Sequence, residues 1–322
     1  MAAQRESLPP GTLLGPYRLL KTIAKGGFSL IYLADDEDTG EEVVIKEYMP
    51  KRIAQRDRDG RVMPLEPRFG ENLYQGRKLF FQEAAALATL KHPSIVRVLD
   101  FFLANDTGYL VMPNERGRNL GAYIQERRGG LSTTFILDVF VPILDALSLL
   151  HRRSMVHLDV KPGNIHLRHG NRPILLDLGA VHRFARGGAR GGQVITAGYS
   201  PLEQYQRHGR IGPWTDVYAV GASIRACMDG RTPPPTPERQ KEDTLVPAAV
   251  DLKTRYPMAL CELVDWSMSM EIDQRPQDAG ELRAALGQRL AEGSGLSPAR
   301  SAPAPESEGL GRPDSGGPPG GR

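Results

Sequence analysis

The sequence predicts an α+β chain of two unequal lobes, a small one built on an antiparallel sheet and a larger helical one. Residues 17–112 contain short β-branched and aromatic runs that turn residues separate, and one helical segment interrupts them. After residue 112, apolar residues recur at the three- and four-residue spacing of helices. A chain of 322 residues is long enough for a bilobal unit with a large core.

Five runs in the small lobe are expected to form an antiparallel meander. Their β-branched and aromatic content is typical of strands, and they occupy residues 17–24, 28–34, 41–48, 94–102 and 108–112. In residues 77–90 the apolar side chains share one helical face, and Pro93 lies just beyond its end. This segment is the one helix expected in the small lobe.

The large lobe is expected to contain a long central helix and three further helical segments. Ser132 can cap the long helix, whose apolar residues repeat at three and four: Ile136, Val139, Phe140, Ile143, Leu147 and Leu150. The further helical patterns occupy residues 214–228, 259–270 and 276–291. Cys227 and Cys261 lie inside apolar stretches far apart, so they are interpreted as buried reduced thiols.

Three segments lie outside this regular pattern. Residues 1–16 are expected to be a flexible N-terminus. Residues 292–322 contain 8 Gly, 6 Pro and 5 Ser, a composition typical of a disordered tail. Residues 49–76 form a basic insert with little periodicity, carrying Lys51, Arg52, Arg56, Arg58 and Arg61. The favoured interpretation of the insert is a solvated loop over the small lobe, and the alternative is a docking surface for an acidic partner.

Composition limits the classes of function. The formal charge of +3 arises from 41 basic and 38 acidic side chains, which gives no support for bulk nucleic-acid binding. No stretch approaches the ~18 uninterrupted apolar residues of a membrane-spanning helix. The first residues contain no apolar segment of the secretory type. A cytoplasmic location without a membrane span is therefore expected.

A glycine-rich turn, a lysine and a glutamate form the first candidate constellation. Gly26 and Gly27 would let backbone N–H groups approach phosphate oxygens, although alone they are equally compatible with an ordinary hairpin turn. Lys46 ends an apolar run, where it is either simply exposed or the cation that grips phosphates. Glu83 is the only carboxylate in the expected helix at 77–90 and lies on its more apolar side. It is therefore the candidate partner of Lys46.

The strongest signal is the segment HLDVKPGNI at residues 157–165. In this spacing, Asp159 can orient a hydroxyl proton, Lys161 can neutralise phosphoryl charge and Asn164 can ligate Mg²⁺. An apolar strand at 174–176 then delivers Asp177, followed two residues later by glycine. An aspartate at such a strand end is well placed to bind a metal that bridges two phosphates.

The order of these motifs resembles the eukaryotic-like protein kinase superfamily, and in detail its bacterial serine/threonine kinases. The segments GGFSLIYLA, IKEYMP, HPSIVRVLDFF and GPWTDVYAVGA carry the closest resemblance, which covers about Tyr17 to Ala291. It implies a bilobal protein kinase fold with a kinase domain at residues 17–291. The N-lobe would be 17–112, the hinge 113–118 and the C-lobe 119–291.

The resemblance implies a role for each site residue. Lys46 would pair with Glu83 and hold the ATP phosphates, Asp159 would be the catalytic base, and Lys161 would neutralise phosphoryl charge. Asn164 and Asp177 would hold two Mg²⁺. The ATP-contacting positions would be Ile23, Ala24, Lys25, Gly26, Gly27, Phe28, Ser29, Leu30, Ile31, Val44, Lys46, Met112, Pro113 and Glu115.

The resemblance also implies three features around the site. Met112 would be the gatekeeper, and Pro113 would keep its carbonyl acceptor for adenine although it lacks an N–H. Glu203 would pair with Arg275. Asp216 would support the catalytic loop from below.

Four positions depart from the usual family pattern. Ala24 and Ser29 replace glycines, which predicts a stiffer turn, and Leu178 replaces a phenylalanine by another apolar residue. Leu158 replaces the arginine that usually pairs with a phosphate on the activation segment. We therefore expect activity not to require phosphorylation of this segment, and alanine at Thr196 and Ser200 to leave turnover within a few-fold.

The leading hypothesis is an active Mg²⁺-dependent enzyme that transfers the ATP γ-phosphoryl group to serine or threonine hydroxyls of proteins. The pattern Lys161-Pro162 resembles serine/threonine rather than tyrosine kinases. Autophosphorylation is an open possibility, with tail serines as candidates. An ATP-binding pseudokinase scaffold is the alternative, although the main site residues are all present. A small-molecule phosphotransferase is disfavoured by the segment GYSPLEQY and the helix of Asp216, which resemble a platform for protein substrates.

Overall fold

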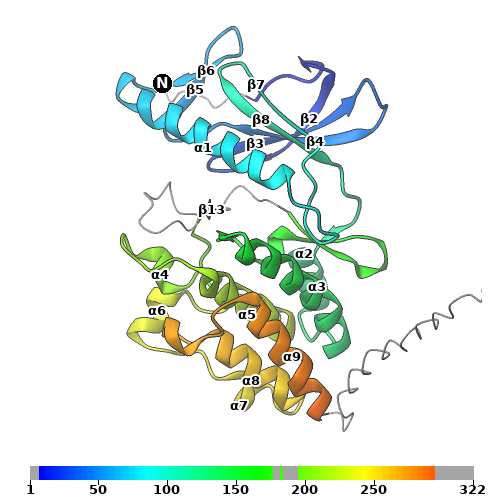
Figure 1. The fold of residues 1–322 in the computed structure, drawn as a ribbon, viewed down its shortest axis with the longest axis vertical. Helices are drawn as coiled ribbons and strands as arrows, with labels where there is room; N and C mark the ends of the chain where they lie inside the picture. Colours follow the sequence, from blue (N-terminus) through cyan, green and yellow to red (C-terminus); the bar gives the residue numbers. More distant parts are fainter. Residues whose placement is uncertain (1–6, 177–181, 184–194, 294–322) are drawn as a thin grey trace, which may run out of the picture.

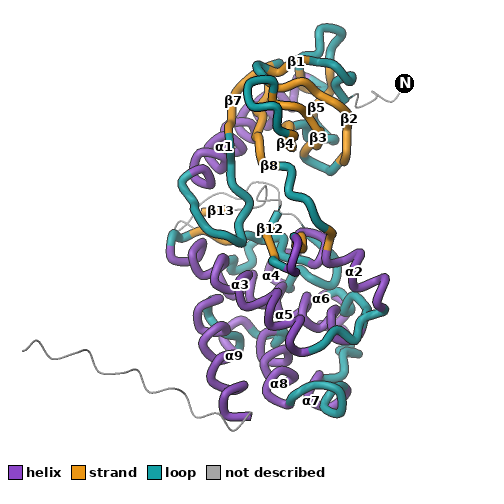
Figure 2. The backbone as a smooth tube through the Cα atoms, turned by 90° about the vertical axis from the view of Figure 1, so that its right-hand side faces the viewer, coloured by secondary structure: helices purple, strands orange, loops and turns teal. Residues whose placement is uncertain are grey.

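The computed structural model describes residues 7–176, 182–183 and 195–293. Its two lobes are stacked along the long axis of the molecule, the sheet-containing lobe above and the helical lobe below (Figure 1). Figure 2 shows the same division after a quarter turn, with most strands above and most helices below. The predicted two-lobed α+β fold is confirmed. Asp177, Leu178 and the tail serines lie outside the described residues.

A six-stranded antiparallel sheet forms the small lobe. Its order is β1-β2-β3-β4-β8-β7. The strands are β1 (Leu13–Leu14), β2 (Tyr17–Lys25), β3 (Ser29–Asp36), β4 (Glu42–Tyr48), β7 (Asp100–Ala104) and β8 (Thr107–Pro113). Residues 8–14, which were expected to be flexible, belong to this lobe. Leu8 and Leu14 are buried, and the Leu8 N–H donates to the Tyr32 hydroxyl at 3.1 Å.

The strand expected at residues 94–102 begins only at Asp100. The backbone before it pairs with the other lobe instead. Ser94 O accepts from Leu175 N–H at 2.9 Å, and Val96 N–H donates to Leu175 O at 3.2 Å. Because these backbone groups are already paired, residues 94–96 cannot join the small-lobe sheet.

The helix of the small lobe, α1 (Gly70–Ala88), lies along one side of the sheet in both views (Figures 1 and 2). It starts seven residues before the expected segment at 77–90, directly after the 3₁₀ turn η1 (Pro67–Phe69). Leu73 is buried in this added part, so tertiary packing extends the helix through a stretch with little periodicity of its own. The longer helix also contains Glu71, which is exposed.

The basic insert is not a solvated loop. It contains a hairpin of β5 (Ala54–Arg56) and β6 (Val62–Pro64), and Ala54 and Val62 are buried in the core. The Arg56 side chain is only 5% exposed. The other four lysine and arginine side chains at residues 51–61 of the insert are exposed, as expected: Lys51, Arg52, Arg58 and Arg61.

The large lobe is mainly helical. Its helices are α2 (Leu120–Arg127), α3 (Thr133–Arg152), α4 (Leu202–Tyr205), α5 (Pro213–Asp229), α6 (Thr236–Lys241), α7 (Ala248–Asp251), α8 (Met258–Ser267) and α9 (Ala279–Gly293). The long helix α3 packs against α5 and α9. The predicted cap is confirmed, because Ser132 accepts the Phe135 N–H at 3.2 Å. Within the described residues, α3 alone is long and apolar enough to span a membrane. Its buried residues pack in the lobe core, so this is weak evidence for a span.

Short strands flank the loops that lie near the boundary of the two lobes. β9 (Arg118–Asn119), β11 (Ile165–Leu167) and β12 (Pro173–Leu175) form a small sheet, and β10 (Met155–Val156) pairs with β13 (His182–Arg183). The turns η2 (Pro162–Asn164), η3 (His169–Asn171) and η5 (Ile272–Gln274) connect neighbouring segments.

A buried ion pair joins distant segments of the large lobe. Arg275 Nη1 lies 2.8 Å from Glu203 Oε1, with side chains 0% and 3% exposed, which confirms the predicted pairing. Thr215 also donates to Glu203 Oε1, at 3.1 Å. Cys227 and Cys261 are buried free thiols, as predicted.

We expect Arg275→Ala to lower the free energy of unfolding by about 3–5 kcal/mol, because Glu203 would remain buried without its cation. Urea denaturation followed by circular dichroism measures the change. The control is Glu66→Gln, which removes an exposed pair with Arg68 and should cost less than about 1 kcal/mol. Equal losses in the two variants would contradict the expectation.

Candidate functional site

The glycine-rich turn joins β2 to β3 at the edge of the small lobe. Gly26 N–H donates to Ser29 O at 2.9 Å, and Gly27 and Phe28 are exposed. Most other residues of the expected ATP-contacting stretch line the two strand ends: Ile23, Ala24, Lys25 and Ile31. Leu30 differs, since it is fully buried in the small-lobe core and its side chain does not reach the turn surface.

Lys46 and Glu83 lie close enough to interact. Lys46 is buried on β4, opposite Ile31 in the strand register. Burial raises the pKa of Glu83 on α1 to about 8, and the positive charge of Lys46 lowers it in part. Burial thus favours the protonated form of Glu83, whereas the charge of Lys46 stabilises its ionised form.

The loop at residues 157–165, the expected catalytic loop, brings together the three site residues predicted in it. Lys161 Nζ donates to both carboxylate oxygens of Asp159, at 2.9 and 2.8 Å. Asn164 Nδ2 donates to Asp159 Oδ2 and to its backbone O, both at 2.8 Å. This leaves the Asn164 amide oxygen as the atom that could bind a cation. These bonds fix the Asp159 carboxylate, and the residue is only 6% exposed.

Thr196 is a fourth member of this cluster that the sequence interpretation treated only as a modification site. Its hydroxyl donates to Asp159 Oδ1 at 2.7 Å and accepts from Lys161 Nζ at 3.1 Å. Ser200 Oγ accepts the Thr196 N–H at 3.0 Å and is itself buried. No local motif indicates this contact, because Thr196 lies 37 residues beyond Asp159.

Asp216 supports the catalytic loop from α5, as predicted. It is fully buried and accepts the N–H groups of His157 and Leu158, both at 2.8 Å. Although burial alone would raise it, hydrogen bonds and positive charge from His151 and His157 hold the pKa of Asp216 below its usual value. Leu158 has a φ of +63°, a conformation that a leucine rarely adopts without such support.

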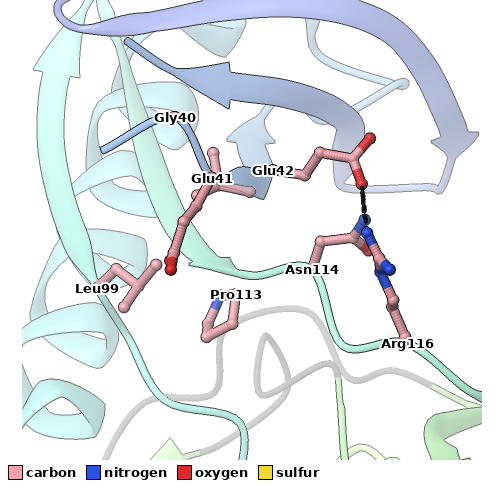
Figure 3. Close-up of a pocket in the computed structure, with 8 residues that line it drawn as sticks. Gly40, Glu41, Glu42, Leu99, Pro113, Asn114 and Arg116 are labelled. Carbon is pink, nitrogen blue, oxygen red and sulfur yellow. Dashed lines mark hydrogen bonds and ion pairs between the residues drawn. The ribbon is translucent and has the colours of Figure 1, made fainter. Parts of the chain in front are cut away.

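The hinge follows β8 and is tied to the start of β4. Val44 pairs with Met112 and Val43 with Pro113 in the strand register. Figure 3 shows Asn114 and Arg116 directed toward Glu42, with Asn114 Nδ2 at 3.2 Å from its carboxylate. Arg116 Nη2 lies 3.9 Å from the same Glu42 oxygen.

A pocket of about 390 Å³ lies beside this hinge (Figure 3). Its lining includes Leu99 and Pro113 but neither Lys46 nor Asp159. We therefore do not assign the phosphates of a nucleotide to this pocket. On the other side of the hinge, Glu115 lies 3.8 Å from Arg168 of the large lobe, which further anchors the segment.

The donor set fits Mg²⁺ bound mainly through phosphates. Within the three described ranges, no group of three His, Cys, Asp or Glu side chains could hold a metal ion by itself. The expected set instead comprises Asn164 and Asp177, of which Asp177 lies outside the described residues. Few protein ligands together with phosphate oxygens is the coordination that Mg²⁺ favours.

Comparison with known proteins agrees with this geometry. A family model for the protein kinase domain matches residues 17–279. The DNA damage-responsive serine/threonine-protein kinase RqkA of Deinococcus radiodurans is 29% identical over 294 residues, which cover 85% of this chain and 40% of RqkA. The serine/threonine-protein kinase PknA of Nostoc sp. is 31% identical over 230 residues, covering 67% of this chain and 37% of PknA.

The solved structure titled PpkA-294 apo form superposes with a TM-score of 0.74 at 29% identity. The alignment covers 87% of this chain and 99% of that chain. This chain therefore has the fold of that structure over most of its length, whereas it spans only about two fifths of the curated relatives RqkA and PknA.

We expect the stability contributed by Glu83 to fall as the pH rises from about 4.5, its unfolded pKa, to about 8, its folded pKa. In this window the folded protein retains a proton that the unfolded chain has released, so stability falls by up to about 1.4 kcal/mol per pH unit. The melting temperature of the parent should therefore decline relative to that of Glu83→Gln as the pH is raised. Glu71→Gln, in the exposed first turn of α1, is the control. Parallel pH profiles for the parent and Glu83→Gln would contradict the assignment.

Proposed function

We propose that the chain, which belongs to the protein kinase domain family, transfers the γ-phosphoryl group of ATP to serine or threonine hydroxyls of proteins. The observation that carries the proposal is the cluster of Asp159, Lys161 and Asn164, whose contacts all converge on one carboxylate. The names of RqkA and PknA, both serine/threonine-protein kinases, support the same class of acceptor.

In the proposed mechanism, each residue has a separate task. Lys46 holds the ATP phosphates and is itself oriented by Glu83, and the glycine-rich turn covers them. Asp159 orients the attacking hydroxyl and accepts its proton, while Lys161 neutralises charge on the transferred group. Asn164 and Asp177 would hold Mg²⁺, which neutralises the phosphate charge when bound. Most of the rate enhancement then comes from positioning and electrostatics.

The proposed kinase domain comprises residues 17–291, with the hinge at 113–118. The match of the family model to residues 17–279 supports these limits, and α9 continues to Gly293. Proteins with serine or threonine acceptors are the proposed substrates. The tail from residue 292 is the proposed region of autophosphorylation, because it carries Ser294, Ser297, Ser301, Ser307 and Ser315.

A pseudokinase scaffold is less well supported. Lys46, Asp159 and Asn164 are all present, and the hydrogen bond between Asn164 and Asp159 supports a site that is arranged for catalysis. The buried pair of Glu203 and Arg275 holds the end of the segment that precedes α5. That segment also contains Thr196, which binds Asp159. The segment is therefore held beside Asp159, where a protein acceptor would bind in the proposed mechanism.

We further propose that activity does not depend on phosphorylation of the activation segment. Residues 178–195 contain no serine, threonine or tyrosine. Leu158, at the position of the usual arginine, packs against Val156 and Ile211 in a small apolar cluster. Residues 178–195 therefore offer no phosphate acceptor, and the usual cationic partner is missing at position 158.

We revise the expectation that alanine at Thr196 and Ser200 preserves turnover, because both side chains make contacts at the site. The Thr196 hydroxyl binds both Asp159 and Lys161, and Ser200 Oγ accepts the Thr196 N–H. Alanine at Thr196 removes two contacts to the catalytic loop, and alanine at Ser200 removes the hydrogen bond that holds Thr196. Such variants consequently cannot separate loss of phosphorylation from loss of geometry.

We expect Asp159→Asn to reduce phosphoryl transfer by about 10²-fold or more while MgATP still binds, because the base is lost and the shape is kept. Lys46→Met should instead weaken the binding of MgATP. Labelled γ-phosphate incorporation into a generic protein acceptor and a nucleotide titration measure the two effects. The control is Asp138→Asn, an exposed carboxylate on α3. Parental rates in both site variants would refute the proposed roles.

We expect phosphatase treatment of the purified protein to leave initial turnover within about threefold, because no phosphate is required to order the loop. Thr196→Ala should lose at least about tenfold, whereas Thr196→Ser keeps the hydroxyl and most of the activity. Mass spectrometry confirms that the treated protein is free of phosphate. A large loss on phosphatase treatment, restored by MgATP, would show a phosphorylation switch.

A further inference from the structure

The small lobe contains a fully buried ion pair that the proposed mechanism does not use. Arg56 Nη2 lies 2.6 Å from Glu47 Oε2, and the two side chains are 5% and 0% exposed. Arg56 Nη1 also donates to Gly60 O at 2.6 Å, within the turn of its own hairpin. The pair thus connects the basic insert to β4, the strand that carries Lys46.

Both oxygens of the Glu47 carboxylate are satisfied by short hydrogen bonds. The Tyr32 hydroxyl donates to Oε2 and the Tyr109 hydroxyl to Oε1, each at 2.7 Å. These tyrosines come from β3 and β8, the strands on either side of β4. Since removal from water makes a buried charge costly, Glu47 is stable here only while Arg56 and the two hydroxyls face it.

Strand geometry relates this pair to the candidate site. Successive side chains of a strand point to opposite faces, so Glu47 and Lys46 lie on opposite sides of β4. Lys46 interacts with Glu83 of α1 on one side, while Glu47 is held by the hairpin on the other. A shift of the backbone at residue 47 therefore moves Lys46 as well.

The insert also holds the glycine-rich turn. Met49 N–H donates to Phe28 O at 2.9 Å, and Lys51 N–H donates to Gly27 O at 2.8 Å. Two backbone bonds thus attach the start of the insert to the turn proposed to cover the ATP phosphates.

The far end of the insert leads into α1. β6 is followed by η1 and then by the helix, and Figure 1 shows the hairpin beside the N-terminal end of α1. Tyr48 packs its hydroxyl against Gly76, where any Cβ would collide with it, and its ring lies 5.7 Å from that of Phe80. The helix that carries Glu83 is therefore held from β4 and from the insert.

We propose that the insert, residues 49–76, is a brace that sets the relative positions of the glycine-rich turn, Lys46 and α1. Arg56 is its positioning residue and acts on Lys46 through Glu47. The inference rests on the proposed kinase function, because it concerns how the same site holds ATP. In this proposal the insert is not a solvated loop, and its buried arginine, Arg56, has a structural role.

The test compares Arg56→Met with Arg58→Met, which removes an exposed arginine from the same hairpin. MgATP affinity by calorimetric titration, the KM for ATP and kcat are measured for each variant. Arg56→Met should weaken MgATP binding and raise this KM by roughly tenfold with kcat within about threefold, since it disturbs binding rather than chemistry. Arg58→Met should stay within about twofold of the parent in all three.

The double variant Glu47→Gln with Arg56→Met tests the route through Glu47. It removes both charges, so MgATP affinity should return to within about threefold of the parent. Should Arg56→Met fail to fold, Arg56→Lys provides the measurement, with a smaller loss expected from its single donor group. Equal behaviour of Arg56→Met and Arg58→Met, or no rescue in the double variant, would overturn the proposal. A loss of kcat and melting temperature at unchanged affinity would also overturn it.

Failure of the proposed function has a different signature. If the parent binds no MgATP, the kinase assignment fails, and the brace is then judged by hydrogen exchange in the protein without nucleotide. Arg56→Met should increase exchange at residues 26–30 and 43–48 relative to Arg58→Met. Unchanged exchange in these segments would refute the brace independently of any kinase activity.

Discussion

The geometry of the catalytic loop depends on one buried carboxylate. Asp216 accepts two successive backbone N–H groups, from His157 and Leu158, immediately before Asp159. These bonds hold a leucine in a left-handed conformation that an unsupported loop would avoid. Asp216 of α5 thereby sets the backbone conformation just before Asp159, and with it the direction of the Asp159 side chain. The contacts of Lys161, Asn164 and Thr196 then fix a carboxylate whose backbone is already oriented.

The two lobes hold their parts of the site by different means. In the large lobe, short hydrogen bonds fix Asp159 on several sides, and Gln204 adds a bond to Leu158 O at 2.9 Å. In the small lobe, Lys46 faces a glutamate whose pKa burial raises to about 8, so the charge of this pair depends on its surroundings. Direct hydrogen bonds thus fix the carboxylate that would orient the hydroxyl, whereas protonation of Glu83 governs the charge beside the lysine that would hold phosphates.

The sequence predicted contacts between residues that are close in the chain, and it predicted distant contacts only where a motif or the family resemblance pointed to them. Asp159, Lys161 and Asn164 lie within six residues, so their spacing already determined their convergence. Thr196 was missed as a ligand of Asp159 because 37 residues separate them. The Glu203–Arg275 pair spans 72 residues and was predicted only through family resemblance. The late start of β7 was missed because Leu175, in the other lobe, takes the backbone groups of residues 94–96.

The basic insert shows why composition misled at one point. The five lysine and arginine side chains at residues 51–61, with little periodicity, predict a solvated loop, and four of them are indeed exposed. Arg56 differs because β4 presents a buried carboxylate that two tyrosine hydroxyls do not neutralise. A cation from outside the sheet balances Glu47, and the hairpin of three-residue strands places it there with its side chain only 5% exposed. The partner that distinguishes Arg56 from its neighbours therefore lies on β4, outside the insert, where the composition of the insert could not indicate it.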